Sequence, residues 1–89
     1  MRLAMLCSGL LLAGCLGGPV EQSPGCATYV ACLRAMDADA GTTTNLDRFL
    51  PGGACWVNGV TGEGCATGCE RALTRLKERT PALPAECAP

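Results

Sequence analysis

The sequence contains no histidine, and its only aromatic residues are Tyr29, Phe49 and Trp56. Without histidine the chain cannot form Ser–His or Cys–His nucleophile pairs, histidine metal sites or the commonest general base. Its glycines fit neither the phosphate-loop spacing nor the dinucleotide-binding spacing. Three aromatics in 89 residues are also too few to hold a fold by hydrophobic burial alone. We therefore expect no enzyme: no catalytic residues, no cofactor and no metal site.

Long hydrophobic runs are missing as well, apart from one near the beginning of the sequence. The segment from Leu3 to Gly14 is uncharged, contains five leucines and follows the single basic residue Arg2. It is shorter than the about 20 apolar residues that span a bilayer, but it has the length of the apolar region of a secretory signal. Residues 1–14 are therefore predicted to be a signal peptide.

The end of this segment carries the most specific motif in the chain. Leu12-Ala13-Gly14-Cys15 resembles the lipobox of bacterial lipoproteins, in which an aliphatic residue and small residues precede the cysteine. The resemblance implies cleavage after Gly14, a diacylglyceryl group on the Cys15 thiol and attachment to the membrane through that lipid. Because Leu16 rather than aspartate follows, it also implies the outer membrane if the host is Gram-negative. We expect a cell-envelope protein in which residues 15–22 form the lipidated cysteine and a tether.

The cysteine count leads to the same interpretation. Of eight cysteines, Cys7 would leave with the signal peptide and Cys15 would take lipid. Six remain, at Cys26, Cys32, Cys55, Cys65, Cys69 and Cys87. An even set in a short exported chain predicts three disulfides. Cys65-x3-Cys69 fits a redox or zinc role poorly, because the redox motif has two intervening residues and zinc needs four reduced ligands.

Two segments have the apolar periodicity of helices. The first covers about residues 24–38, where Ser23 is a good N-cap and Pro24 a good first helical residue. The second covers about residues 63–79 and stops before a proline. Residues 40–64 between them are glycine-rich and predicted to be a loop.

The expected loop contains two local signals. A helical turn is predicted at residues 46–50, and Asn58-Gly59 indicates a turn. The expected fold, over residues 23–89, is small, disulfide-rich and mainly α: a two-helix antiparallel hairpin with a stapled glycine-rich loop. If the helices are antiparallel, Cys32 lies near Cys69 and the returning tail brings Cys87 to Cys26. The predicted bridges are then Cys26–Cys87, Cys32–Cys69 and Cys55–Cys65.

Two surface features leave alternatives open. Arg71, Arg75 and Arg79 form an i, i+4 row, which is either a solvated face suited to a helix C-terminus or an anion-binding strip. Such a strip would bind lipid headgroups, envelope polysaccharide or an acidic protein. Trp56 either covers a disulfide in the core or anchors a partner. The net charge of −1 argues against nucleic acid as a partner.

A wider resemblance covers most of the chain after Cys15. Cys26-x5-Cys32, then Pro51-Gly52-Gly53-Ala54-Cys55-Trp56, then Cys65-x3-Cys69 before a leucine-bearing helix, resemble the small cysteine-rich lipoproteins that are numerous in myxobacteria. These motifs are structural, so the resemblance implies no activity. The expected product is a non-enzymatic structural or interaction module anchored in the envelope. The alternative is a surface-held inhibitor or binding module for an envelope or secreted protein.

Overall fold

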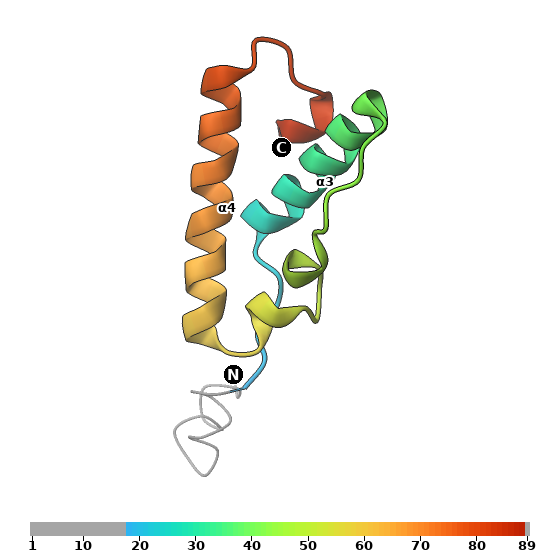
Figure 1. Cartoon of the computed structure of the whole chain (residues 1–89). Coiled ribbons are helices and arrows are strands. Elements are labelled where there is room, and N and C mark those ends of the chain that lie inside the picture. Colours follow the sequence, from blue (N-terminus) through green and yellow to red (C-terminus); the bar gives the residue numbers. More distant parts are fainter. Residues whose placement is uncertain (1–17, 89) are drawn as a thin grey trace.

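The computed structural model describes residues 18–88 (Figure 1). The two long elements of this part are the helices α3 (Pro24–Ala40) and α4 (Gly59–Arg79). Three single 3₁₀ turns complete it, namely η1 (Asp47–Phe49), η2 (Ala54–Trp56) and η3 (Ala85–Cys87). No strand occurs within residues 18–88. The described protein is therefore small and mainly helical, and it is held by disulfides, as the sequence predicted.

Helix α3 begins and ends at residues suited to those positions. The Ser23 hydroxyl accepts a hydrogen bond from the backbone N–H of Cys26 at 3.1 Å, and Pro24 occupies the first turn, where its missing N–H is not needed. The helix ends at Gly41, which adopts the left-handed conformation (φ 72°, ψ 28°) that glycine reaches without steric cost. The helix is two residues longer than predicted, because Asp37 and Asp39 continue it up to this glycine.

Helix α4 starts four residues earlier than predicted. The predicted turn at Asn58-Gly59 lies where the chain bends into α4 (Figure 1), and the Asn58 side chain also accepts a hydrogen bond from the Thr61 N–H at 2.8 Å and caps the helix. The sequence interpretation used Asn58 only as a turn signal and therefore placed the start of the helix too late, although an asparagine at this position also caps helices. The helix ends at Arg79, before Thr80 and Pro81, as expected.

The two helices run in the same direction, so the predicted antiparallel hairpin is wrong (Figure 1). Cys26, near the start of α3, is bonded to Cys69, and Cys32, further along α3, packs with Leu73, further along α4. The stretch between Gly41 and Asn58 carries the chain back along the helices before α4 begins. The tail then folds back over α3, and η3 contacts that helix.

This direction corrects two of the predicted disulfides. The bridges are Cys26–Cys69, Cys32–Cys87 and the expected Cys55–Cys65. With co-directional helices, Cys26 lies beside Cys69 rather than near the far end of α4. The returning tail therefore delivers Cys87 to Cys32 instead of Cys26. The bridge between Cys55 and Cys65 joins η2 to the first half of α4 and does not depend on helix direction.

Cysteines form much of the core. Five of the six have side chains that are at most 1% exposed, and Cys65 is 8% exposed. One buried cluster lies beside the first half of α4, with members Cys26, Cys55, Trp56, Cys65 and Cys69. A second cluster lies further along the helices, with members Cys32, Leu73 and Cys87. Tyr29 packs against both, so it links the two halves of a core that has few large side chains.

Candidate functional site

The expected lipid-attachment and cleavage residues, Cys15 and Gly14, lie outside the described residues. The chain that follows them is already tied to the domain before α3 begins. The Val20 N–H donates to the Trp56 carbonyl at 2.9 Å, and the Gln22 side-chain amide donates to the Phe49 carbonyl at 2.9 Å. Residues 20–22 of the expected tether are thus docked on the loop that carries η1 and η2, at the end of the molecule where α4 begins (Figure 1).

All six cysteines between residues 18 and 88 are in disulfides. The spacing of Cys65 and Cys69 on α4 places both sulfurs on one face of the helix, where they bridge to two different segments. Over the same range no group of three or more cysteine, aspartate or glutamate side chains is arranged to hold a metal ion. The cysteines of this domain therefore serve as crosslinks in the geometry observed.

Trp56 is a core residue, because its side chain is only 2% exposed. Its indole N–H donates to the Phe49 carbonyl at 3.0 Å, so its one polar group is satisfied inside the domain. It packs with the Cys55–Cys65 bridge in the first buried cluster. The hypothesis that Trp56 is an exposed partner anchor is therefore wrong, and the alternative interpretation, that it covers a disulfide, is the one observed.

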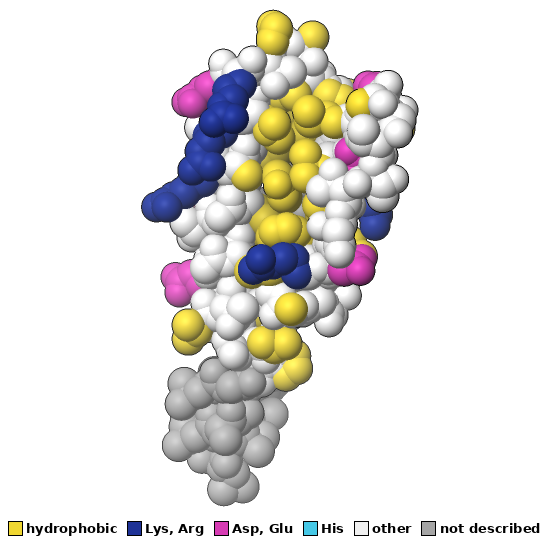
Figure 2. Space-filling model, viewed as in Figure 1, with side chains coloured by type: hydrophobic (Ala, Val, Ile, Leu, Met, Phe, Trp, Pro, Cys, Tyr) yellow, Lys and Arg dark blue, Asp and Glu magenta, His cyan; other side chains and the backbone are white. Residues whose placement is uncertain are grey.

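The arginine row lies on the exposed side of α4. Arg71, Arg75 and Arg79 are all exposed, and Figure 2 shows basic side chains along the outer edge of this helix. Arg71 and Arg75 border an open hollow of about 430 Å³ together with Thr67, Glu70 and Thr74. Lys77 and Arg79 lie in the last turn, where positive charge stabilises the helix C-terminus. Both interpretations of the row, solvated face and anion-binding strip, are compatible with this exposure.

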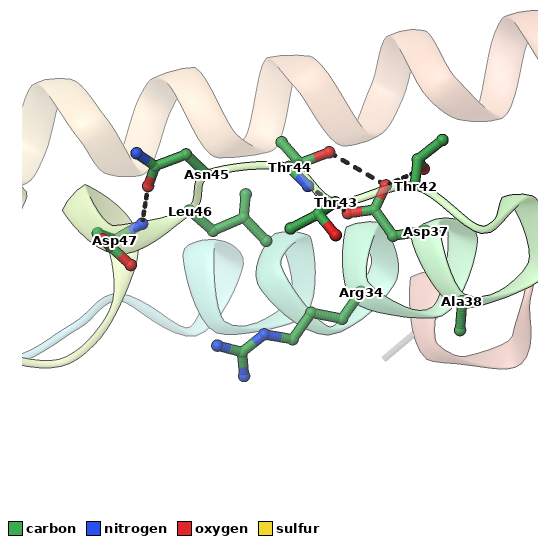
Figure 3. Close-up of a pocket in the computed structure, with 9 residues that line it drawn as sticks. All are labelled: Arg34, Asp37, Ala38, Thr42, Thr43, Thr44, Asn45, Leu46 and Asp47. Carbon is green, nitrogen blue, oxygen red and sulfur yellow. Dashed lines mark hydrogen bonds between the residues drawn. The ribbon is translucent and has the colours of Figure 1, made fainter.

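An open hollow lies between the end of α3 and the loop after it (Figure 3). It measures about 650 Å³ and is open to solvent. Its carboxylate, Asp37, accepts hydrogen bonds from the Thr42 hydroxyl at 2.8 Å, the Thr44 N–H at 2.8 Å and the Thr44 hydroxyl at 3.1 Å. The bond from Thr42 is the largest influence and lowers the pKa of Asp37; desolvation, the next largest, raises it, and the two bonds from Thr44 lower it further, so the pKa lies below its ordinary value.

The surroundings of Asp37 indicate a structural role. Its acceptor positions are used by the loop that leaves the helix, so the carboxylate fixes residues 42–44 against α3. Arg34 extends away from the carboxylate in Figure 3, and Asn45 bonds to the Asp47 N–H at 3.0 Å. The side chains of Asp37 and Asn45 are thus bonded to the loop that lines the hollow, and they hold its shape.

The sequence interpretation missed a group of exposed valines and one aromatic contact. Val20, Val57 and Val60 keep large fractions of their side chains exposed, at the end of the domain nearest residue 18. Val20 lies between proline and glutamate, and Val57 and Val60 flank Asn58-Gly59, so none of the three belongs to an apolar periodicity that could have marked it. Tyr29 and Phe49 pack edge to face, with ring centroids 5.5 Å apart.

Comparison with known proteins gives no assignment: no family model, curated protein or solved structure matches this chain. Among the helices of residues 18–88, none has the length and apolar character needed to cross a bilayer.

Proposed function

We propose that this chain is a membrane-anchored lipoprotein of the cell envelope whose domain is a non-enzymatic structural or interaction module. The observation that carries the proposal is the complete pairing of the six cysteines between residues 18 and 88. Disulfides of this kind form and persist in oxidising compartments outside the cytoplasm. Because the six pair among themselves, the framework does not require Cys15, which the lipobox resemblance assigns to lipid.

The proposed anchor has a defined physical strength. Each buried methylene contributes about 0.8 kcal/mol, one acyl chain gives only marginal binding, and two or more hold a protein stably on a membrane. A diacylglyceryl group on Cys15 supplies two chains. The residue after it is Leu16, so we propose the outer membrane as the location if the host is Gram-negative.

Intact mass spectrometry of the protein extracted from membranes tests the proposal. We expect a mass that begins at an acylated Cys15, and six thiols that react with an alkylating reagent only after reduction. Cys15→Ser should abolish lipidation, whereas the matched variant Cys7→Ser, within the same segment, should leave it intact. An unlipidated wild-type chain in the membrane-extracted material would refute the anchor. Thiols that alkylate in the native protein would instead reopen a redox or metal-binding role.

The second candidate is a surface-held inhibitor or binding module for an envelope or secreted protein. The observation that favours it is the exposed row of Arg71, Arg75 and Arg79, which remains as the proposed contact now that Trp56 is buried. Binding to an immobilised acidic polysaccharide or acidic protein should then fall when all three are replaced by glutamine. Arg34→Gln, an exposed arginine on α3, is the control and should bind as wild type does.

A further inference from the structure

Three valines are the large hydrophobic side chains that stay exposed in the described part of the chain. Val20 is 39% exposed, Val57 51% and Val60 81%. All three belong to one corner: Val57 and Val60 flank the residue that caps α4, and the Val20 N–H is bonded to the carbonyl that precedes Val57. We call these three residues the valine corner. In Figure 2, hydrophobic side chains reach the surface at the end of the molecule where the grey residues begin.

The valine corner is held in shape by close packing beneath it. Gly62, on the first turns of α4, has no Cβ, and an added Cβ there would lie 2.9 Å from Cγ2 of Val20 and 3.3 Å from Cε3 of Trp56. Val20 therefore fits against the bare backbone of the helix. The hydrogen bond from the Val20 N–H to the Trp56 carbonyl holds the backbone of the same residue against η2. Val20 is consequently held against the start of α4 by both packing and a hydrogen bond.

The corner is also close, along the chain, to the proposed lipid. Val20 is five positions after Cys15, a path of at most about 18 Å when fully extended. The opposite end of α4 is much further away: at about 1.5 Å per residue, Arg71 lies about 18 Å and Arg79 about 30 Å beyond Gly59. A lipid on Cys15 would thus bring the valine end of α4 nearer to the bilayer than the end that carries Arg79.

The charges around the corner define the kind of surface it fits. Residues 18–22 and 57–63 contain two charged side chains, Glu21 and Glu63, and none that is basic. Arg48, in the neighbouring turn η1, lies over the Phe49 ring at 5.3 Å and 3.8 Å from the Cys65 sulfur. Attraction to anionic headgroups is therefore not the basis of contact. Exposed valines near the interface favour the boundary between headgroups and acyl chains of a zwitterionic bilayer.

We propose that the valine corner docks on the bilayer that holds the lipidated Cys15, and that α4 then projects its arginine-bearing end away from the membrane. This inference rests on the proposed lipid anchor. Because the acyl chains already supply stable attachment, the valines set the orientation of the domain rather than its affinity. The arginine row then faces the aqueous compartment, so its partner is not the lipid of the same bilayer.

Methyl NMR of the lipidated protein tests the docking directly. The sequence contains four valines, the three of the corner and Val30, which is 5% exposed inside the domain. The protein is labelled with ¹³C at valine and leucine methyl groups and placed in phosphatidylcholine–phosphatidylethanolamine nanodiscs that carry a nitroxide near the top of the acyl chain. We expect the signals of the valine corner to be lost, that of Val30 to weaken less, and that of Leu83 to persist.

Two variants and one mass measurement make the outcome decisive. Val60→Asp, at the most exposed of the three positions, should restore the Val20 and Val57 signals, whereas Ala82→Asp at the far end should not. Sharp valine signals in protein whose mass confirms lipidation, or loss of the Leu83 signal instead, would overturn the docking alone. A mass without lipid would refute the anchor, and the docking with it.

Discussion

The bridges Cys55–Cys65 and Cys32–Cys87 close loops of different length, so their removal should destabilise the domain by different amounts. Cys55 and Cys65 are 10 residues apart, whereas Cys32 and Cys87 are 55 apart. The longer loop is already shortened by Cys26–Cys69, however. With that bridge in place, the path from Cys32 to Cys87 runs back to Cys26 and on from Cys69, roughly 24 residues in all.

Loop-closure entropy converts these lengths into free energies. It gives about 2.7 kcal/mol for a closed loop of about 10 residues and about 3.4 kcal/mol for one of about 24 residues. Replacing both cysteines of a pair by alanine leaves similar local changes, because these cysteines are all at most 8% exposed. The Cys32→Ala/Cys87→Ala protein should therefore be less stable than the Cys55→Ala/Cys65→Ala protein by about 0.7 kcal/mol.

Urea unfolding without reductant measures this difference, since each free energy follows from the midpoint and slope of the transition. A third variant, Cys26→Ala/Cys69→Ala, is the sharpest control. The two long bridges together close one ring of roughly 24 residues, and removing either bridge opens it. The two long-bridge variants should therefore lose the same amount of stability. The reasoning fails if the variant without Cys55–Cys65 is the least stable of the three. It also fails if the two long-bridge variants differ from each other more than from the short-bridge variant.

Three further predictions concern single side chains. Ser23→Ala should lower the free energy of unfolding by about 1 kcal/mol through loss of the α3 cap, with exposed Thr67→Ala as the control in the same urea assay. Gly64→Ala should stabilise α4 by about 1 kcal/mol, because alanine favours the helix and nothing lies within 4 Å of an added Cβ. Gly62→Ala should instead destabilise the domain, because the added Cβ would crowd Val20. Equal effects of the two substitutions would contradict this packing. The pKa of Asp37 lies below its ordinary 3.8 in the folded protein, so the stability it contributes is present above pH 3.8 and is lost as the pH falls through the folded pKa. The urea midpoint of Asp37→Asn should accordingly depend less on pH in the acid range than that of the wild type, and parallel curves would refute this.

Local signals in the sequence were sufficient for the helices. Ser23-Pro24 predicted the start of α3, and Thr80-Pro81 predicted the end of α4, because caps and proline act through their immediate neighbours. The start of α4 was less determined, since Asn58 can cap a helix or close a turn with the same oxygen. Only the downstream hydrogen bond to Thr61 distinguishes the two.

Those local signals could not predict the direction of α4 relative to α3. Apolar periodicity marks the buried face of each helix but carries no information about whether the neighbouring helix runs up or down. The loop between Gly41 and Asn58 is long enough to allow either direction, and the structure uses it to return the chain. The Cys55–Cys65 pairing was predictable because it depends on a short separation. Cys26–Cys69 and Cys32–Cys87 were not, because they depend on the direction.

Among the surface features, too, those set by local spacing could be predicted and those set by long-range contacts could not. The arginine row could be predicted from i, i+4 spacing on a helix, and it is exposed as that spacing requires. The burial of Trp56 depends on a loop carbonyl, from Phe49, that no pattern in the sequence places beside it. The sequence did not predict the valine corner, because it depends on the Asn58 cap and on the packing of Val20 against Gly62. Val20 and Gly62 lie about 40 residues apart along the chain.

The order of the bridges has a consequence for how an exported chain would mature. A chain that crosses a membrane from its N-terminus presents Cys26 and Cys32 to the oxidising side first, and these two are not partners of each other. Only Cys55 and Cys65 are both neighbours in sequence and partners in the structure. Oxidation in order of arrival would therefore trap a mispaired intermediate, and thiol–disulfide exchange must then resolve it. If the chain is exported as proposed, the yield of native protein should accordingly depend on a disulfide isomerase in that compartment, and not on an oxidase alone.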